Sequence, residues 1–77
     1  MPSKIPRSEL KPELKRFGDN LRRERVKRHL TQEQTAERAE IALRTLQKIE
    51  AGQINILVTT ARRLREAIGC PWKKLMD

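Results

Sequence analysis

The chain has 77 residues, of which 36% are apolar, so it can form one domain with a modest core and is too short for a second. Eighteen Lys and Arg against ten Asp and Glu give a net charge of +8, which favours a polyanionic partner such as nucleic acid over a merely basic surface. Phe17 and Trp72 are the only aromatic residues, which argues against a protein that stacks single-stranded bases on aromatic side chains.

Residues 1–12 are predicted to form a flexible basic arm. Three prolines lie among basic side chains there, and few residues are apolar. Such an arm can lie along DNA, and a frayed terminus is the alternative. Residues 13–77 are then predicted to form a single folded domain.

The first helix is predicted to begin after Pro12 and to run to about Arg28. Leu14, Phe17 and Leu21 recur at three- and four-residue steps and define one apolar face. Four residues further, that face reaches Arg25, a charged residue at a core position. A buried arginine requires a carboxylate partner.

The second helix is predicted over Gln32–Ala39. Thr31 and Gln34 have the spacing of a capping box, in which each side chain accepts a hydrogen bond from the other residue's backbone. Ala36 and Ala39 share one face, and their small side chains let a neighbouring helix approach closely.

A three-residue turn, residues 40–42, is predicted to lead into a third helix over 43–51 that stops at Gly52. Leu46 and Ile49 would face the core, and Glu50 lies near the same side. Glu50 is therefore the candidate partner of Arg25. The outward positions of this helix are polar or basic: Arg44, Gln47 and Lys48.

Two further helices complete the prediction. The apolar spacing of residues 58–68 fits a fourth helix closed by Gly69, and Pro71 stands where a short fifth helix would begin. Within that last helix we expect three side chains to pack back on the core: Trp72, Leu75 and Met76. No segment alternates as a half-buried strand does, so the fold class is all-α, a bundle of five helices.

The second and third helices form a predicted helix-turn-helix. Two helices joined by a short turn, with polar side chains outward on the second, can present those side chains to base edges. The major groove of DNA, about 12 Å wide, admits one α-helix and distinguishes all four base pairs. The pattern therefore indicates sequence-specific binding of double-stranded DNA.

The sequence resembles the Cro/repressor family (lambda-repressor-like, XRE-type) of helix-turn-helix regulators from phages and bacteria. The resemblance covers residues 14–76 and rests on LRRERVKRHLTQEQTAERAEIALRTLQKIEAGQIN, then LREAIG and CPWKKLM. It implies a five-helix lambda-repressor-like bundle that regulates transcription and needs no cofactor or metal. Residues 13–77 would be the DNA-binding domain, with helix 43–51 as its recognition helix.

The resemblance also assigns roles to particular residues. Arg44 is the foremost base-reading candidate, because arginine bidentate to guanine is the commonest specific contact. Two residues would hold phosphates, Arg22 and Asn55, and two would form a structural ion pair, Arg25 and Glu50. The full set of base-contact candidates is Gln32, Leu43, Arg44, Gln47 and Lys48.

Four positions depart from the family pattern. Glu40 stands where glycine is usual, so a left-handed backbone there would cost roughly 1–2 kcal/mol. Ala42 stands where a Ser or Thr usually caps the third helix. Thr35 stands where a core leucine is common, and Arg65 stands where a small residue is common. These departures suggest a turn that differs in detail and a marginal domain stabilised by dimerisation.

Several alternatives stay open at this stage. An enzyme is disfavoured, because one His and Cys70 alone form neither a triad nor a metal-ligand cluster. A protein-interaction module, or an antitoxin acting through a toxin partner, is the main alternative. We expect a homodimer on a pseudo-palindromic operator, with the C-terminal helices at the interface. The lone cysteine and the absence of a long apolar run favour the cytoplasm, with no membrane contact.

Overall fold

The computed structural model describes the backbone of residues 7–77 and the side chains of residues 11–77, and within that part of the chain every regular element is a helix. The predicted all-α class and the count of five helices are confirmed. No helix in the described residues is long and apolar enough to cross a membrane. The helices are α1 (Arg7–Lys27), α2 (Gln32–Ala39), α3 (Leu43–Glu50), α4 (Val58–Ile68) and α5 (Trp72–Met76).

The predicted start of the first helix is wrong. Helix α1 begins at Arg7 and contains Pro12, so residues 7–12 are helical. Proline has no backbone N–H and leaves the carbonyl of Ser8 without its helical donor. That loss falls near the end of a 21-residue helix, where the remaining hydrogen bonds maintain the helix. Residues 1–6 of the predicted arm lie outside the described residues.

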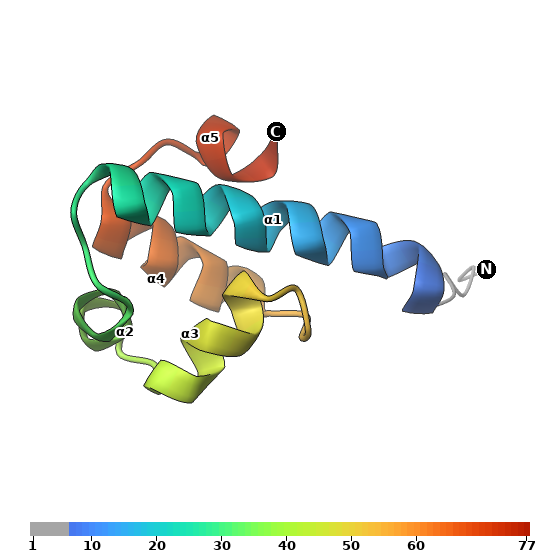
Figure 1. Ribbon diagram of the computed structural model, residues 1–77, viewed down its shortest axis with the longest axis horizontal. Helices are drawn as coiled ribbons and strands as arrows, with labels where there is room; N and C mark the ends of the chain where they lie inside the picture. Colours follow the sequence, from blue (N-terminus) through green and yellow to red (C-terminus); the bar gives the residue numbers. More distant parts are fainter. Residues whose placement is uncertain (1–6) are drawn as a thin grey trace.

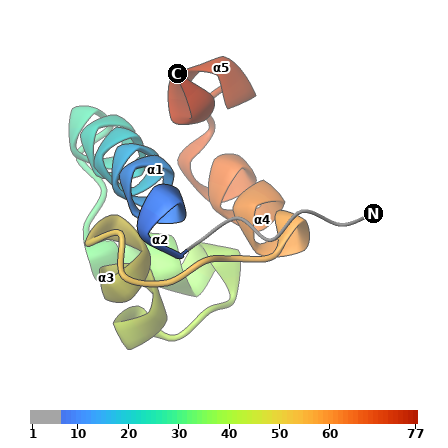
Figure 2. The same cartoon turned by 90° about the vertical axis from the view of Figure 1, so that its right-hand side faces the viewer.

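The long α1 organises the bundle. It packs against α3 on one flank and α5 on the other, while α2 packs against α3 and α4. Figure 1 shows α1 running along the length of the molecule, with α5 on one side and α2 and α3 on the other. Figure 2 shows α1 and α3 on one side of the molecule and α4 on the opposite side. The connection between α3 and α4 crosses between these two sides.

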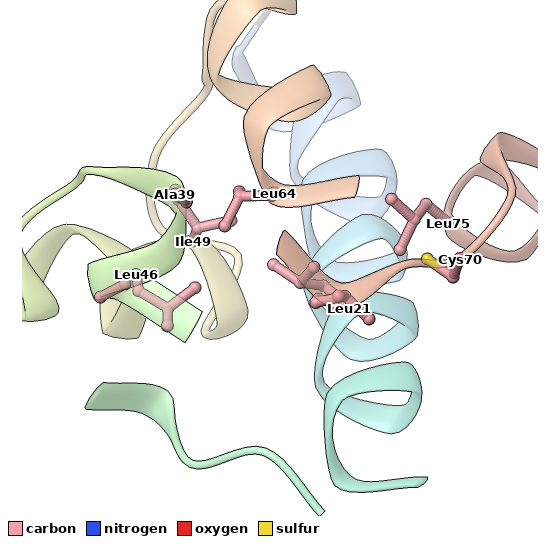
Figure 3. Close-up of a cluster of buried hydrophobic side chains, with 9 residues drawn as sticks. Leu21, Ala39, Leu46, Ile49, Leu64, Cys70 and Leu75 are labelled. Carbon is pink, nitrogen blue, oxygen red and sulfur yellow. The ribbon is translucent and has the colours of Figure 1, made fainter. Parts of the chain in front are cut away.

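Five helices contribute to one apolar core (Figure 3). Leu21, Leu46, Leu64 and Leu75 are completely buried, and Ala36 and Ala39 allow α2 to pack closely, as predicted. Of the three α5 side chains expected to pack on the core, only Leu75 is buried, since Trp72 is 37% and Met76 59% exposed. The buried set is Leu21, Ala36, Ala39, Leu46, Ile49, Leu64, Ile68, Cys70 and Leu75.

The turn between α2 and α3 keeps the three residues that the sequence predicts, 40–42. Glu40 adopts the left-handed conformation, with φ 57° and ψ 44°, so the expected departure in backbone geometry does not occur. The backbone N–H groups of Glu40 and Ile41 donate to the carbonyls of Glu37 and Ala36. These bonds form a Schellman motif, which offsets the cost of a non-glycine residue at this position. Ala42 caps α3 without a side-chain hydrogen bond, as expected.

Two glycines set the distance between α1 and α3. A Cβ on Gly18 would lie 2.4 Å from the carbonyl oxygen of Ile49 and 2.6 Å from that of Glu50. Gly52, which follows α3 at φ +71°, lies equally close to α1, since a Cβ there would be 2.7 Å from the Cα of Lys15. Gly18, which weakens helix propensity, is therefore required for the close contact between α1 and α3.

Candidate nucleic-acid interface

Helix α3 has one buried face and one accessible face. Leu46, Ile49 and Glu50 are buried against the bundle. Arg44 and Gln47 are exposed, Lys48 is half-buried and Leu43 is 36% exposed. Four of the five base-contact candidates therefore lie on the side of α3 that a DNA groove can reach.

The fifth candidate, Gln32, lies at the start of α2 and contacts α3 through its side chain. Its Nε2 donates to Glu50 Oε1 at 3.1 Å, and its Oε1 accepts a long hydrogen bond from Gln47 Nε2 at 3.5 Å. Both amides are thereby oriented across the helix-turn-helix. The sequence did not indicate this contact, because the two residues are fifteen positions apart.

Arg25 and Glu50 lie together, where the helix faces placed them. Arg25 Nε donates to Glu50 Oε2 at 2.7 Å, and Nη2 donates to Oε1 at 3.1 Å. Arg25 Nη1 also donates to the carbonyl of Leu30, at 2.7 Å. The two side chains are only 10% and 3% exposed, so water screens the pair weakly. Through Glu50 and Gln32 this pair joins α1, α2 and α3 in one polar network.

The two phosphate-contact candidates occupy separate elements. Arg22 is exposed on α1 and forms no ion pair among the described residues. Asn55 is exposed in the connection between α3 and α4, where its Oδ1 accepts from the backbone N–H of Ile56 at 2.9 Å. No hydrogen bond brings these two residues together, so any shared role requires an extended ligand.

A second polar cluster, on the opposite flank of α1, was missed by the sequence analysis. Glu24 is 1% exposed and accepts from Arg28 Nη1 at 2.8 Å and from Arg23 Nε at 3.2 Å. The hydrogen bond from Arg28, aided by Arg23 and Lys27, lowers the pKa of Glu24 to about 2. The signal was available in the sequence, since Glu24 and Arg28 are four residues apart on one helix.

This cluster fixes the last helix. Asn20 Nδ2 donates to the carbonyl of Leu75 at 2.9 Å, and Arg23 Nη2 donates to that of Lys74 at 3.1 Å. These carbonyls belong to the last turn of α5, where a helix has no internal donors. The Glu24 cluster is therefore a structural clamp between α1 and α5.

The described residues offer little for catalysis. They contain no group of three or more His, Cys, Asp or Glu placed to hold a metal ion. Cys70 is 2% exposed, and burial raises the pKa of its thiol, so it packs in the core as a small apolar residue.

Comparison with known proteins is consistent with this geometry. A family model described as helix-turn-helix matches residues 21–75. The chain belongs to the helix-turn-helix family. The resemblance to XRE-type regulators is thereby confirmed, and this helix-turn-helix protein is a DNA-binding regulator of transcription and not an enzyme.

Among solved structures, one similar chain covers most of the length of the helix-turn-helix protein. It is the restriction-modification controller protein C.AhdI from Aeromonas hydrophila, with a TM-score of 0.79 and 26% sequence identity. The match covers 83% of this chain and 97% of that chain. A comparison with curated proteins finds no match.

Proposed function

We propose that this helix-turn-helix protein binds a pseudo-palindromic operator in double-stranded DNA as a homodimer, with helix α3 in the major groove. The observation that carries the proposal is the division of α3 into two faces. Leu46, Ile49 and Glu50 hold the helix in the bundle, while Arg44 and Lys48 remain accessible. A rigidly held helix with basic residues outward suits base reading in the groove.

Arg44 is the principal base-reading residue of the proposal. Its side chain is exposed in the first turn of α3 and forms no hydrogen bond to another described residue. It is therefore available for two parallel hydrogen bonds to guanine O6 and N7. Leu43, also in that turn, suits contact with a thymine methyl group.

The oriented amides of Gln32 and Gln47 support further polar contacts with the same half-site. The hydrogen bond between them holds both side chains at the accessible edge of the helix-turn-helix. Lys48, one turn beyond Arg44, suits either a guanine or a phosphate. Arg22 and Asn55 are proposed to contact phosphates, which position the protein and carry no sequence information.

The proposed dimer surface joins the start of α4 to the end of α5. Leu57 is 73%, Val58 80% and Met76 59% exposed, which is unusual for large apolar side chains in a small domain. Val58 and Met76 also line a groove of about 370 Å³ beside Phe17 of α1. A second copy covering this surface would bury the apolar side chains and present two α3 helices to half-sites about 10–10.5 bp apart.

The likeness to a restriction-modification controller protein favours a controller role over that of a phage repressor or an antitoxin. We therefore propose that the protein acts as a controller of this kind and that it is located in the cytoplasm, beside the DNA. A protein acting mainly through a partner such as a toxin is the alternative class. It would discriminate poorly between DNA sequences.

Titration onto DNA tests the proposal. Wild-type protein, Arg44→Ala and Arg63→Ala are titrated onto the DNA upstream of the protein's own gene and onto a scrambled duplex. Arg63 is a matched control, because it is an exposed arginine on α4 and not on α3. The proposal expects selective binding that Arg44→Ala relaxes and Arg63→Ala preserves. Equal weak binding to both duplexes by all three proteins would favour the protein-partner alternative.

A further inference from the structure

The N-terminal two thirds of α1 lies outside the matched family region. Helix α1 begins at Arg7, whereas the helix-turn-helix match begins at Leu21. Figure 1 shows the first turns of α1 extending past the ends of the other helices. Phe17, Gly18 and Asn20 pack against the rest of the bundle, whereas Lys11 and Lys15 are exposed.

Three exposed basic residues form a stripe along α1: Lys11, Lys15 and Arg22. Spacings of four and seven residues place all three within about 40° of one another around the helix axis. Along the axis they span roughly 16 Å, which is long enough to face several phosphates of one DNA strand. These three residues are called the α1 basic stripe below.

The α1 basic stripe lies on the flank of α1 that faces the C-terminal end of α3. Gly18 falls within the stripe between Lys15 and Arg22, and it is the residue packed against the carbonyls of Ile49 and Glu50. Lys15 itself lies against Gly52, at the start of the connection that carries Asn55. The stripe is therefore beside the recognition helix and its phosphate-contact candidate, not on the α5 flank.

The protein itself leaves the stripe largely unneutralised. Lys11 and Arg22 form no ion pair among the described residues. Lys15 Nζ contacts Asp19 Oδ1 at 2.7 Å, but these side chains are 61% and 56% exposed. Exposed pairs of this kind are weak and readily exchanged for another anion. By contrast, the basic residues on the α5 flank surround the buried carboxylate of Glu24.

We propose that the α1 basic stripe is a second phosphate-binding surface, in which Lys11 and Lys15 extend the contact of Arg22 along the DNA backbone. The proposal rests on the proposed function, since it takes α3 to be in the groove. Because the stripe is part of a continuous helix, its charges reach DNA without the ordering cost of a flexible arm. Asp19 opposes the contact by pairing with Lys15 in the free protein.

The test is the salt dependence of binding, measured by fluorescence anisotropy on the operator duplex and on a scrambled duplex. The association constant K falls as salt rises, and each lost phosphate contact makes the slope of log K against log salt less steep by about 0.9. We expect Lys11→Gln/Lys15→Gln to make this slope less steep by between about 0.9 and 1.8 on both duplexes. The preference for operator over scrambled DNA should be unchanged, and Asp19→Asn should tighten binding to both.

The matched control is Lys73→Gln/Lys74→Gln, which removes the same charge from exposed positions on α5. Equal slopes for the two double variants would overturn the proposal, because net charge alone would then explain the effect. An alternative role for Lys15 is stabilisation of the α3 C-terminus. A lower unfolding midpoint with an unchanged slope would show that role and would also overturn the proposal.

The outcomes separate this inference from the proposed function. If Arg44→Ala relaxes sequence preference while the α1 variants match the α5 control, only the α1 surface is wrong. If the wild type lacks sequence preference, the proposed function fails. The slopes on scrambled DNA still test the stripe in that case.

Discussion

Arg25 of α1 and Glu50 of α3 form a buried, two-bonded ion pair that also fixes the position of α2. The Arg25 guanidinium makes hydrogen bonds of 2.7 and 3.1 Å to the two carboxylate oxygens, and one of these oxygens accepts from Gln32 at 3.1 Å. The orientation of α3 thus depends on a polar contact between residues 25 positions apart.

Replacing Glu50 by Gln should destabilise the fold strongly. The variant leaves the Arg25 charge buried without a counter-charge, which costs about 3–5 kcal/mol. Urea unfolding measures the change. Glu66→Gln is the control, because Glu66 pairs with Arg62 on the surface and its loss should cost under about 1 kcal/mol. An unchanged midpoint for Glu50→Gln would show that the ion pair does not hold the helices together.

Gly18→Ala should destabilise the protein even though alanine favours helix formation. The added Cβ has no room, since it would lie 2.4 Å from a backbone carbonyl of α3. Forcing α1 and α3 apart should cost about 1–3 kcal/mol and weaken DNA binding by displacing α3. Arg22→Ala, on the same helix but exposed, controls for helix propensity in thermal unfolding. A variant at Gly18 that melts at or above the wild-type temperature would contradict the packing.

Because the carboxylate of Glu24 is buried and ionised, the free energy of unfolding should decrease at acidic pH. Its pKa lies near 2 in the folded protein and near 4.5 when unperturbed, so in between the unfolded state binds the proton more readily. The contribution of ionised Glu24 to the stability of the folded protein is complete above about pH 5 and is lost as the pH falls toward 2. Urea unfolding from pH 6 to 2.5 should show a smaller acid loss for Glu24→Gln than for the wild type. Equal losses would contradict the assignment.

Val58→Glu should convert the proposed dimer to a monomer. The substitution places a charge on the apolar surface formed by Leu57, Val58 and Met76, where burial against a second copy would be unfavourable. Sedimentation equilibrium at tens of micromolar measures the mass. Val26→Glu, on α1 at 53% exposure, is the matched control and should keep the wild-type mass. A wild-type protein that is monomeric with and without DNA would refute the dimer.

The helix-turn-helix could be predicted because its signals are local. The capping box at Thr31, the three-residue turn and the apolar spacing of α3 each depend on residues within one or two helical turns. Arg25 and Glu50 could be paired because both are charged residues at core positions of their helices. In each case a periodicity or a spacing carried the information.

Other features depend on contacts that no local pattern encodes. The role of Gly18 follows from how closely α3 approaches α1, a distance that no spacing in the sequence encodes. The start of α1 was missed because Pro12 marked a boundary that the helix continues through. The clamp of Asn20 on α5 joins residues 55 positions apart.

The most direct test of base reading by α3 is a binding profile over systematically substituted half-sites, measured for the wild type, Arg44→Ala and Arg22→Ala. We predict that Arg44→Ala removes the preference at one base pair in each half-site, worth about 1–3 kcal/mol. Arg22→Ala should weaken binding to all DNA sequences by the same factor, because a phosphate contact does not distinguish one base from another. If Arg44→Ala instead weakens binding to every DNA sequence equally and leaves the base preferences unchanged, α3 does not read the operator through Arg44.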